Sequence, residues 1–301
     1  MDNSKRHAYL LMVHHQKEFV DLLLEQLDDE RNDIYMHIDS KCKEFCFEDF
    51  NYLKHAGIYK VEPINVNWGD YSQVECEYRL MKKAAKNGPY AYYHFIQGDS
   101  YPLKSQDKLH DFYDRNQGKL FISIDNETGI DRVMLKYFFI RRTVLIPTTP
   151  LDRFLKKVNT LLVEIQKKLN YNHFRRFNLV YKKGFSLWSI PDDFLRYLLS
   201  KEKLVQKIFR HSYLCDEVYI QIMAYNSEFK ERINFINEKY SSSMWYSTWF
   251  LEQEKIRKGN CFLFEDIPLI IDSNCNFARK FSGKEGLAII NTLKKHIEND
   301  E

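Results

Sequence analysis

The chain has 301 residues, enough to bury a sizeable core in one large α/β domain or two small ones. Hydrophobic residues make up 44% and charged residues 29%, a globular balance that excludes intrinsic disorder. Aromatic residues reach 15% against only 10 Gly and 7 Pro, which excludes collagen-like and other low-complexity repeats. With a formal net charge of +3, the whole molecule is not a polyanion binder by bulk electrostatics.

The basic residues gather in one segment. Residues 136–183 hold twelve Lys and Arg residues and two acidic ones, a local charge of +10, so the rest of the chain carries −7. This asymmetry indicates an acidic partner for the segment, such as a phospholipid leaflet or a phosphorylated substrate. The alternative is that the lysines only solvate helix faces, and the sequence leaves both interpretations open.

The N-terminal residues and the cysteines bear on the compartment. Only a short apolar run precedes His14 and His15, so we expect no signal peptide, and no stretch approaches the ~20 apolar residues of a membrane span. We therefore expect reduced thiols in a cytoplasmic protein. Cys42 and Cys46 have no second pair at zinc-finger spacing, which favours two isolated thiols over a metal site.

Hydrophobic periodicity predicts alternating strands and helices in the first half of the chain. In chain order the predicted elements are a strand over 8–13, a helix with its apolar face over 19–27, strands over 34–39 and 57–66, a helix over 72–84 capped by Ser72, and a strand over 92–96. Strands that alternate with helices predict a parallel α/β sheet with ligands at the carboxyl ends of its strands.

Polar side chains follow three of these predicted strands. His14 and His15 come after the first strand, Asp39 closes the second, and Asp99 follows the strand over 92–96. The carboxyl ends of parallel strands share one edge of the sheet, so we expect these side chains to lie along it. Each acid taken alone is more often a cap or turn residue, and that alternative stays open.

The second half is less regular and mainly helical. A strand over 120–124 is followed by an amphipathic helix over 151–169, with its lysines predicted outward and its apolar residues inward (Leu151, Phe154, Leu155, Val158, Leu161, Leu162 and Ile165). Further helices are predicted to start near Pro191, to span 217–225, and to end the chain with Leu287, Ile290, Leu293 and Ile297 inward. No linker or repeat separates the halves, so we predict one domain with an elaborated C-terminal half.

Several common enzyme motifs do not occur. The sequence has no G-x-G-x-x-G, G-x-x-x-x-G-K-[ST], H-E-x-x-H or G-x-S-x-G, so the dinucleotide-binding, P-loop, zincin and α/β-hydrolase interpretations lose their usual support.

Seven segments together resemble one known family. They are AYLLMVHH, IYMHIDSK, WGDYSQVECEYRLMKKA, YYHFIQGDSYPLKS, KKGFSLWSI, CDEVYIQ and NFARKF, in order from about residue 8 to 281. Their order and spacing resemble the core-2/I-branching enzyme family, glycosyltransferase family 14, which also includes the peptide O-xylosyltransferases. The resemblance implies a GT-A-like, Rossmann-like α/β fold with a mixed sheet flanked by helices. It also implies inverting transfer from a UDP-sugar without a metal ion or other cofactor.

The resemblance divides the predicted single domain over 1–301 into two halves. Residues up to about 125 would bind the nucleotide-sugar, and residues from about 126 would bind the acceptor and carry the catalytic group. Inverting transfer needs one carboxylate to remove the proton of the acceptor hydroxyl. Glu217, just before an apolar helix, matches the family's carboxylate and is our candidate base. Its alternative is a simple capping role, because a helix N-terminus favours an acid.

The leaving nucleotide needs its charge neutralised by a divalent ion or by fixed cations. No convincing Asp-x-Asp is present, and Asp125-Asn126-Glu127 is the nearest candidate for a metal-binding acidic pair. Arg257 and Lys280 reproduce the family's spacing between the two basic residues that hold the diphosphate. Their neighbours Lys258 and Arg279 could substitute for them in the alignment.

The resemblance also implies the contacts of the nucleotide and donor sugar. The end of the first strand, Val13 to His15, and Asp39 would bind the nucleotide, while Gly98 and Asp99 match a turn near the donor sugar. Gln73 stands where branching enzymes carry an arginine, so their exact donor contacts do not transfer, and the donor stays open among GlcNAc, xylose and related sugars.

The acceptor side should hold a flat aromatic ring, because the apolar face of a sugar stacks on an indole. Trp249 falls closest to the family's tryptophan and Trp245 lies nearby; the alternative for both is core packing. Glu127 and Arg132 lie in a region that contributes acceptor contacts in relatives.

The resulting hypothesis is a metal-independent inverting glycosyltransferase. Its partners would be a UDP-sugar and a saccharide or lipid-linked oligosaccharide, in bacterial capsule, exopolysaccharide or lipopolysaccharide synthesis. We expect a cytoplasmic protein that contacts the anionic inner face of the membrane through the basic segment. A non-catalytic nucleotide- or sugar-binding protein of the same fold is the alternative. A nucleic-acid binder ranks last, because no RNA-binding signature accompanies the basic residues.

Overall fold

The computed structural model describes residues 5–124, 133–140, 147, 149–234, 243–253, 256 and 259–300. For residues 133, 134, 249, 250 and 253 it describes the backbone alone. The strands are β1 (His7–Val13), β2 (Asn32–Ile38), β3 (Gly57–Val61), β4 (Tyr92–Gln97), β5 (Ser100–Pro102), β6 (Trp188–Ile190), β7 (Trp245–Ser247) and β8 (Phe277–Arg279). The α-helices are α1 (Lys17–Leu27), α2 (Ser72–Ala85), α3 (Gln106–Arg115), α4 (Val133–Lys136), α5 (Pro150–Lys168), α6 (Asp192–Ser200), α7 (Glu202–Phe209), α8 (Tyr219–Tyr225), α9 (Thr248–Gln253), α10 (Ile267–Asp272) and α11 (Gly283–Asn299). Short 3-10 helices include η2 (Phe47–Phe50), η3 (Phe174–Phe177), η4 (Cys215–Glu217), η5 (Glu228–Arg232) and η6 (Phe264–Asp266).

The predicted parallel sheet forms the centre of the molecule. Its strand order is β3-β2-β1-β4-β6, and the first four strands are parallel while β6 runs antiparallel to β4. Strands β1, β2 and β4 are buried along nearly their whole length, as expected for a sheet covered on both faces. A second, three-stranded sheet has the order β5-β8-β7.

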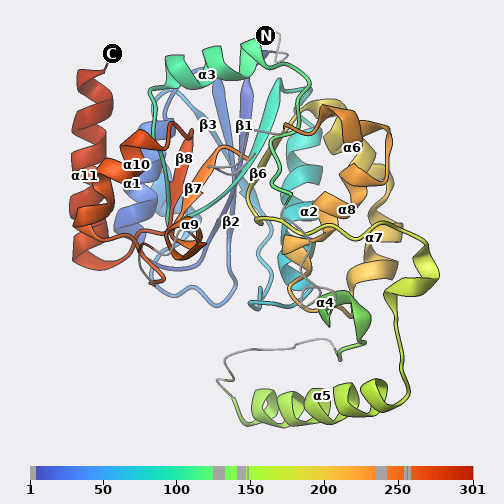
Figure 1. Ribbon diagram of the computed structural model, residues 1–301. Coiled ribbons are helices and arrows are strands. Elements are labelled where there is room, and N and C mark those ends of the chain that lie inside the picture. Colours follow the sequence, from blue (N-terminus) through green and yellow to red (C-terminus); the bar gives the residue numbers. More distant parts are fainter. Residues whose placement is uncertain are drawn as a thin grey trace.

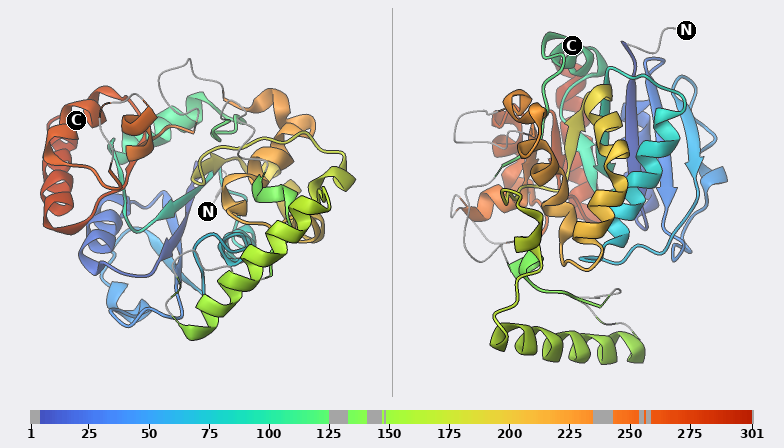
Figure 2. Two further views of the ribbon diagram at one scale, coloured as in Figure 1. Left: turned by 60° about the horizontal axis from the view of Figure 1, so that its bottom comes forward. Right: turned by 90° about the vertical axis from the view of Figure 1, so that its right-hand side faces the viewer.

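Helices cover both faces of the central sheet (Figure 1; Figure 2). Helix α2 packs against β1, β2 and α6, and helix α1 packs against β5 and α11. The prediction of an α/β fold with a mixed sheet flanked by helices is confirmed.

Several predicted boundaries are corrected. Strand β3 ends at Val61 rather than 66, because Pro63 has no N–H to continue the ladder. Ser72 does not cap α2: Tyr71 holds the N-cap position, and the Ser72 hydroxyl instead accepts the N–H of Asn67. The strand over 120–124 is reduced to two isolated bridges, from Leu120 and Phe121.

The helices of the second half form largely where predicted. Helix α6 begins after Pro191, and α11 buries Ile290, Leu293 and Ile297. The predicted helix over 217–225 is divided, because the 3-10 helix η4 ends at Glu217 and α8 begins at Tyr219.

The predicted burial of helix α5 is wrong in part, because its lysines are exposed as expected but four of its seven predicted inward residues are exposed as well. The helix forms over Pro150–Lys168, but its buried residues are the polar Asn159 and Gln166. Four of the predicted inward residues are exposed instead, by 53% at Leu151, 62% at Phe154, 63% at Leu161 and 46% at Ile165. Figure 1 and the right-hand view of Figure 2 show α5 standing apart from the layers of the fold, in agreement with the exposure of these four side chains.

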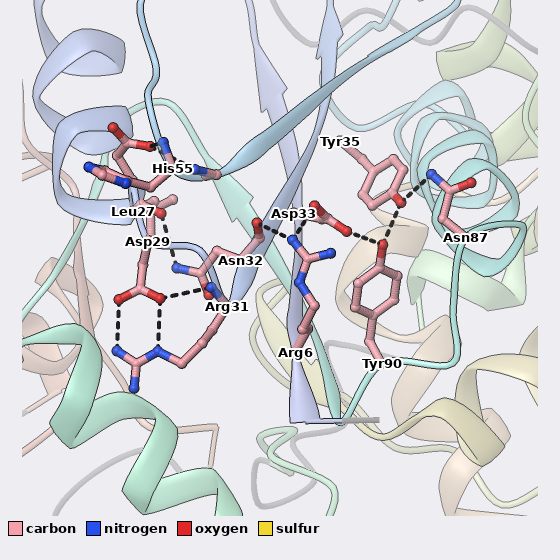
Figure 3. A network of polar contacts seen from close by, with 12 residues as sticks. Arg6, Leu27, Asp29, Arg31, Asn32, Asp33, Tyr35, His55, Asn87 and Tyr90 are labelled. Atoms are coloured by element: carbon pink, nitrogen blue, oxygen red, sulfur yellow. Dashed lines mark hydrogen bonds and ion pairs between the residues drawn. The ribbon is translucent and has the colours of Figure 1, made fainter. Parts of the chain in front are cut away.

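A polar network closes the amino edge of the central sheet, opposite the predicted ligand edge (Figure 3). Arg6 donates to Asp33 at 2.7 Å, and Asp33 also accepts the hydroxyl of Tyr90. The hydroxyls of Tyr35 and Tyr90 lie 2.7 Å apart, and Asn87 donates to Tyr35 at 2.8 Å. Buried polar groups that are paired in this way keep their hydrogen-bond energy on folding, so the network fixes the start of β1 and β2.

No disulfide joins any of the six cysteines. Among the described residues, we find no helix with the length and apolar content that crossing a bilayer requires.

Candidate active site

The ends of β1, β2 and β4 meet at the carboxyl edge, as predicted. The Asp39 N–H donates to the Val13 carbonyl at 2.9 Å, and the Gly98 N–H donates to the Met12 carbonyl at 3.3 Å. Gly98 packs so closely on β1 that a Cβ added there would lie 3.0 Å from the Val13 side chain. The close approach explains the glycine and brings the three strand ends side by side.

His14 and His15 extend this edge with their rings 3.9 Å apart. Burial and the neighbouring His15 lower the pKa of His14, while Asp99 and Asp39 act in the opposite direction. Both carboxylates therefore lie within electrostatic range of one imidazole, so the predicted edge residues form a cluster.

The Asp39 carboxylate organises its own loop. It accepts the N–H groups of Lys41 at 2.8 Å and Val66 at 3.1 Å, and the Lys41 ammonium lies 3.6 Å away. Asp39 also borders a cavity of 220 Å³ that Ile38, Phe45 and others line. The turn role that the sequence left open for Asp39 is therefore present, and it lies beside a space next to the strand ends.

The N-terminus of α1, a common place for a phosphate, already holds a carboxylate. Glu44 accepts the N–H groups of Gln16 at 2.8 Å and Lys17 at 3.0 Å. These two N–H groups are therefore already hydrogen-bonded, so a phosphate at this edge would need other donors or cations.

Asp99 joins β4 to the second sheet. Its buried carboxylate accepts two hydrogen bonds from the Arg279 guanidinium, at 2.9 and 3.1 Å, and lies 3.7 Å from the Lys280 ammonium. Burial alone would raise the pKa of Asp99, but Arg279 and Lys280 bring it below its usual value. The Lys280 side chain is 43% exposed, whereas that of Arg279 is 18% exposed, so Lys280 is the cation of the pair that a ligand can reach.

Glu217 ends η4 and presents its carboxylate to Lys183, with 3.4 Å between Oε2 and Nζ. The Glu217 carbonyl accepts the N–H of Gly184 at 2.9 Å. A Cβ added at Gly184 would lie 1.9 Å from the Ser123 carbonyl oxygen, so only glycine fits there. The segment KKGF thus holds Glu217 from its backbone and its side chain at once.

The residue before Glu217 is a buried carboxyl group. Asp216 Oδ2 accepts a hydrogen bond from Gln73 Nε2 at 3.0 Å. Burial, and then the Glu217 carboxylate, raise the pKa of Asp216 to about 7. Arg279 lowers this pKa in part, so the guanidinium that binds Asp99 also acts on Asp216. Arg279 thus lies within electrostatic range of both Asp99 and Asp216, which brings the predicted donor edge near the segment of the predicted base.

A second buried acid, Glu77, links three elements near Glu217 through hydrogen bonds. Glu77 on α2 accepts hydrogen bonds from Trp188 Nε1 at 3.0 Å and from the Tyr219 hydroxyl at 2.5 Å. Burial raises the pKa of Glu77 well above its usual value. These bonds tie α2, β6 and the start of α8 together, two residues after Glu217.

Trp245 is a core residue, which corrects its assignment to the acceptor side. Its ring is fully buried in β7 and stacks on Phe277 with 4.7 Å between centroids. Burial of this kind leaves no face for a sugar. Four other candidates, Arg257, Glu127, Arg132 and the side chain of Trp249, lie outside the described residues.

Sequence reasoning missed Trp68, whose side chain is 58% exposed. It lies between Asn67, whose Oδ1 accepts from Lys41 Nζ at 3.3 Å, and Gly69, whose carbonyl accepts the Leu214 N–H at 3.0 Å. The chain at Trp68 therefore lies between the Asp39 loop and the segment that leads to Glu217. The string WGDY, which places a large aromatic residue in a polar loop, is the signal that could have drawn attention to it.

The described residues hold no group of three or more His, Cys, Asp or Glu arranged to bind a metal ion. The acidic pair around Asp125 lies outside them.

Comparison with known proteins identifies the family. The model of the core-2/I-branching enzyme family matches residues 7–261. The chain belongs to the core-2/I-branching enzyme family. Membership in this family agrees with the segments that carried the resemblance in the sequence.

Similarity to solved structures is weaker. TarS residues 1–349 from S. aureus gives 13% identity and a TM-score of 0.29, covering 45% of this chain and 41% of that one. The same part of TarS in complex with UDP-GlcNAc gives 15% identity and a TM-score of 0.28, covering 44% and 39%. The branching-family chain thus spans less than half the length of these proteins. No match was found among curated proteins.

Proposed function

We propose that this branching-family enzyme transfers a sugar from a UDP-sugar to a saccharide with inversion and without a metal ion. The observation that supports the proposal is that Arg279, which binds Asp99 beside Lys280, also lies within electrostatic range of Asp216, the neighbour of Glu217. A direct displacement needs a carboxylate that accepts the proton of the attacking hydroxyl and an accessible cation that neutralises the leaving group.

Glu217 would act as the base. Its Oε2 would accept the proton of the acceptor hydroxyl while that oxygen attacks the anomeric carbon, and the bond to the nucleotide oxygen breaks on the opposite face. Lys183, 3.4 Å from this oxygen, and the Gly184 N–H on the Glu217 carbonyl support the carboxylate in position. Proton removal by a placed carboxylate is worth about 10²–10⁴ in rate.

Lys280 would neutralise the charge that develops on the leaving diphosphate. Its ammonium is accessible, whereas Arg279 is committed to Asp99. Arg257 remains the proposed second cation on the basis of its spacing from Lys280 in the sequence. With two fixed cations the diphosphate requires no divalent ion.

The nucleoside would lie against Val13, His14, His15 and Asp39, with Gly98 and Asp99 near the donor sugar. We propose a saccharide or lipid-linked oligosaccharide as acceptor, in capsule, exopolysaccharide or lipopolysaccharide synthesis, and a location at the inner face of the plasma membrane.

A panel of UDP-sugars screened by thermal shift in EDTA tests this function, followed by donor hydrolysis with the best ligand. We expect stabilisation by UDP and by at least one UDP-sugar, and slow release of UDP. Stabilisation that appears only after a divalent metal is added overturns the metal-independent mechanism. Binding with no UDP release, and no difference between wild type and Glu217→Gln, identifies a non-catalytic binding protein instead.

A further inference from the structure

Helix α5 buries two polar residues, Asn159 and Gln166, and exposes part of its apolar face. Asn159 accepts the Ile140 N–H at 2.8 Å, and Gln166 accepts the Phe138 N–H at 2.8 Å while donating to the Phe138 carbonyl at 2.9 Å. Asn159 and Gln166 are seven residues apart, so they lie on one face of the helix. Two side-chain amides on the backbone of 138–140 thus attach α5 to the rest of the protein.

The exposed apolar residues form a stripe along another face. Leu151, Phe154, Leu161, Ile165 and Leu169 are 46% to 73% exposed and follow the spacing of three, four or seven residues that aligns side chains on a helix. A soluble helix normally directs such a stripe into a core. Here the stripe is exposed, which marks an interaction surface.

Exposed basic residues accompany the stripe. Arg153, Lys156, Lys157, Lys167 and Lys168 all lie on α5 and are exposed, and Arg175 and Arg176 follow on η3. The acids of α5 are engaged locally: Asp152 accepts the N–H of Thr149, and Glu164 pairs with Lys167 at 2.7 Å. Apolar side chains flanked by cations on one exposed helix have the chemistry of an anionic lipid surface, in which the stripe enters the acyl boundary and the lysines meet the head groups.

The position of α5 suits such a surface. The helix stands beyond the carboxyl edge of the central sheet, on the side where β1 and β2 end and the candidate active site lies (Figure 1). A membrane that meets α5 would therefore lie on the side of the protein that opens toward Glu217 and Asp99.

We propose that the apolar stripe and the lysines of α5 dock this enzyme onto an anionic phospholipid surface. Docking brings the active-site edge to the membrane, where a lipid-linked acceptor is held; this consequence rests on the proposed function, whereas the docking itself does not.

Co-sedimentation of the full chain with vesicles tests the docking, without any sugar nucleotide present. We expect binding to phosphatidylcholine vesicles that contain phosphatidylglycerol, and at least about tenfold weaker binding to phosphatidylcholine alone. Two variants each should lose at least about tenfold in vesicle affinity: Phe154→Ser with Leu161→Ser, and Lys157→Glu with Lys168→Glu. The control carries the same charge change elsewhere, Lys83→Glu with Lys295→Glu, at exposed lysines of α2 and α11.

The outcomes separate the alternatives. Equal binding to both kinds of vesicle, or equal losses in the α5 and control variants, overturns the proposal. No vesicle binding together with a dimer that Phe154→Ser and Leu161→Ser convert to a monomer shows that the stripe binds a second copy instead. Thermal unfolding of each variant checks folding. UDP affinity is measured on the same samples, so a failure of nucleotide binding is seen separately from a failure of membrane docking.

Discussion

Gln73 Nε2 donates a hydrogen bond to Asp216 Oδ2 at 3.0 Å, across 143 residues of sequence. The same amide accepts the Gly69 N–H through Oε1 at 2.6 Å. One buried side chain therefore joins the loop that bears Trp68 to the segment that bears Glu217. The position of the proposed base therefore depends on contacts between distant segments of the chain and not only on the start of α8.

The buried Asp216 predicts how stability depends on pH. The pKa of Asp216 is raised to about 7 in the folded protein, so its carboxyl group holds a proton there that it loses more readily in the unfolded chain. The stability gained from this proton is complete below the ordinary pKa of an aspartate and is lost as pH rises through 7. Asp216→Asn keeps an acceptor for Gln73 and removes the ionisation. The free energy of unfolding of Asp216→Asn relative to wild type should rise by on the order of 1–3 kcal/mol between pH 5 and pH 8.

Denaturant unfolding at several pH values measures this difference. The exposed Asp272→Asn serves as the control and should show a constant difference from wild type. If the difference in unfolding free energy between Asp216→Asn and wild type stays constant across this range, the pKa of Asp216 is not raised by folding.

Glu217→Gln should slow transfer strongly and leave nucleotide binding intact. Removing the base should lower kcat by about 10²–10⁴, because the amide cannot take the acceptor proton. UDP affinity, measured by calorimetry, should change less than about threefold, since the change keeps the size of the side chain. Glu228→Gln, at an exposed carboxylate on η5, should keep full activity. Normal kcat in Glu217→Gln would assign the carboxylate the capping role alone.

Lys280→Met should weaken UDP binding by about ten- to a hundredfold, because a charge-assisted contact to the diphosphate is lost. Titration calorimetry with UDP and with uridine separates the two parts of the ligand, and uridine affinity should stay the same. Lys284→Met, at an exposed lysine at the start of α11, is the matched control. Equal loss of uridine affinity would show that Lys280 acts only by holding Asp99 and the fold.

Trp68→Ala should raise the KM for a sugar substrate about tenfold without changing the thermal unfolding temperature, because the indole is exposed and contributes little to the core. Trp68→Phe should restore most of the affinity. Tyr52→Ala, at another exposed aromatic, should leave the KM unchanged. Unaltered kinetics in Trp68→Ala would remove the indole from the substrate site.

The sequence predicted the sheet because its strands are short buried runs set between amphipathic helices. Val13, Asp39 and Gly98 come together as expected, since parallel strands end at one edge. The pairing of Asp99 with Arg279 could not be predicted, because it joins β4 to a second sheet whose strands have three residues each. Strands that short carry no periodicity to detect.

The exposure of Phe154 and Leu161 on α5 was predicted wrongly for a physical reason. Periodicity tells which side chains share a face but not what that face meets. In α5 the amides of Asn159 and Gln166 bind backbone groups, and this decides the orientation instead of Phe154 or Leu161. Trp245 is the reverse case, in which an aromatic chosen as a sugar platform is fully buried.

The most direct test of the proposed mechanism is proton NMR of the sugar released from an α-linked UDP-sugar in the presence of EDTA. The proposed mechanism predicts that the first-formed free sugar is the β anomer, and that Glu217→Gln forms it at least about a hundredfold more slowly. An α anomer formed first, or turnover that begins only when a divalent metal is added, would contradict it.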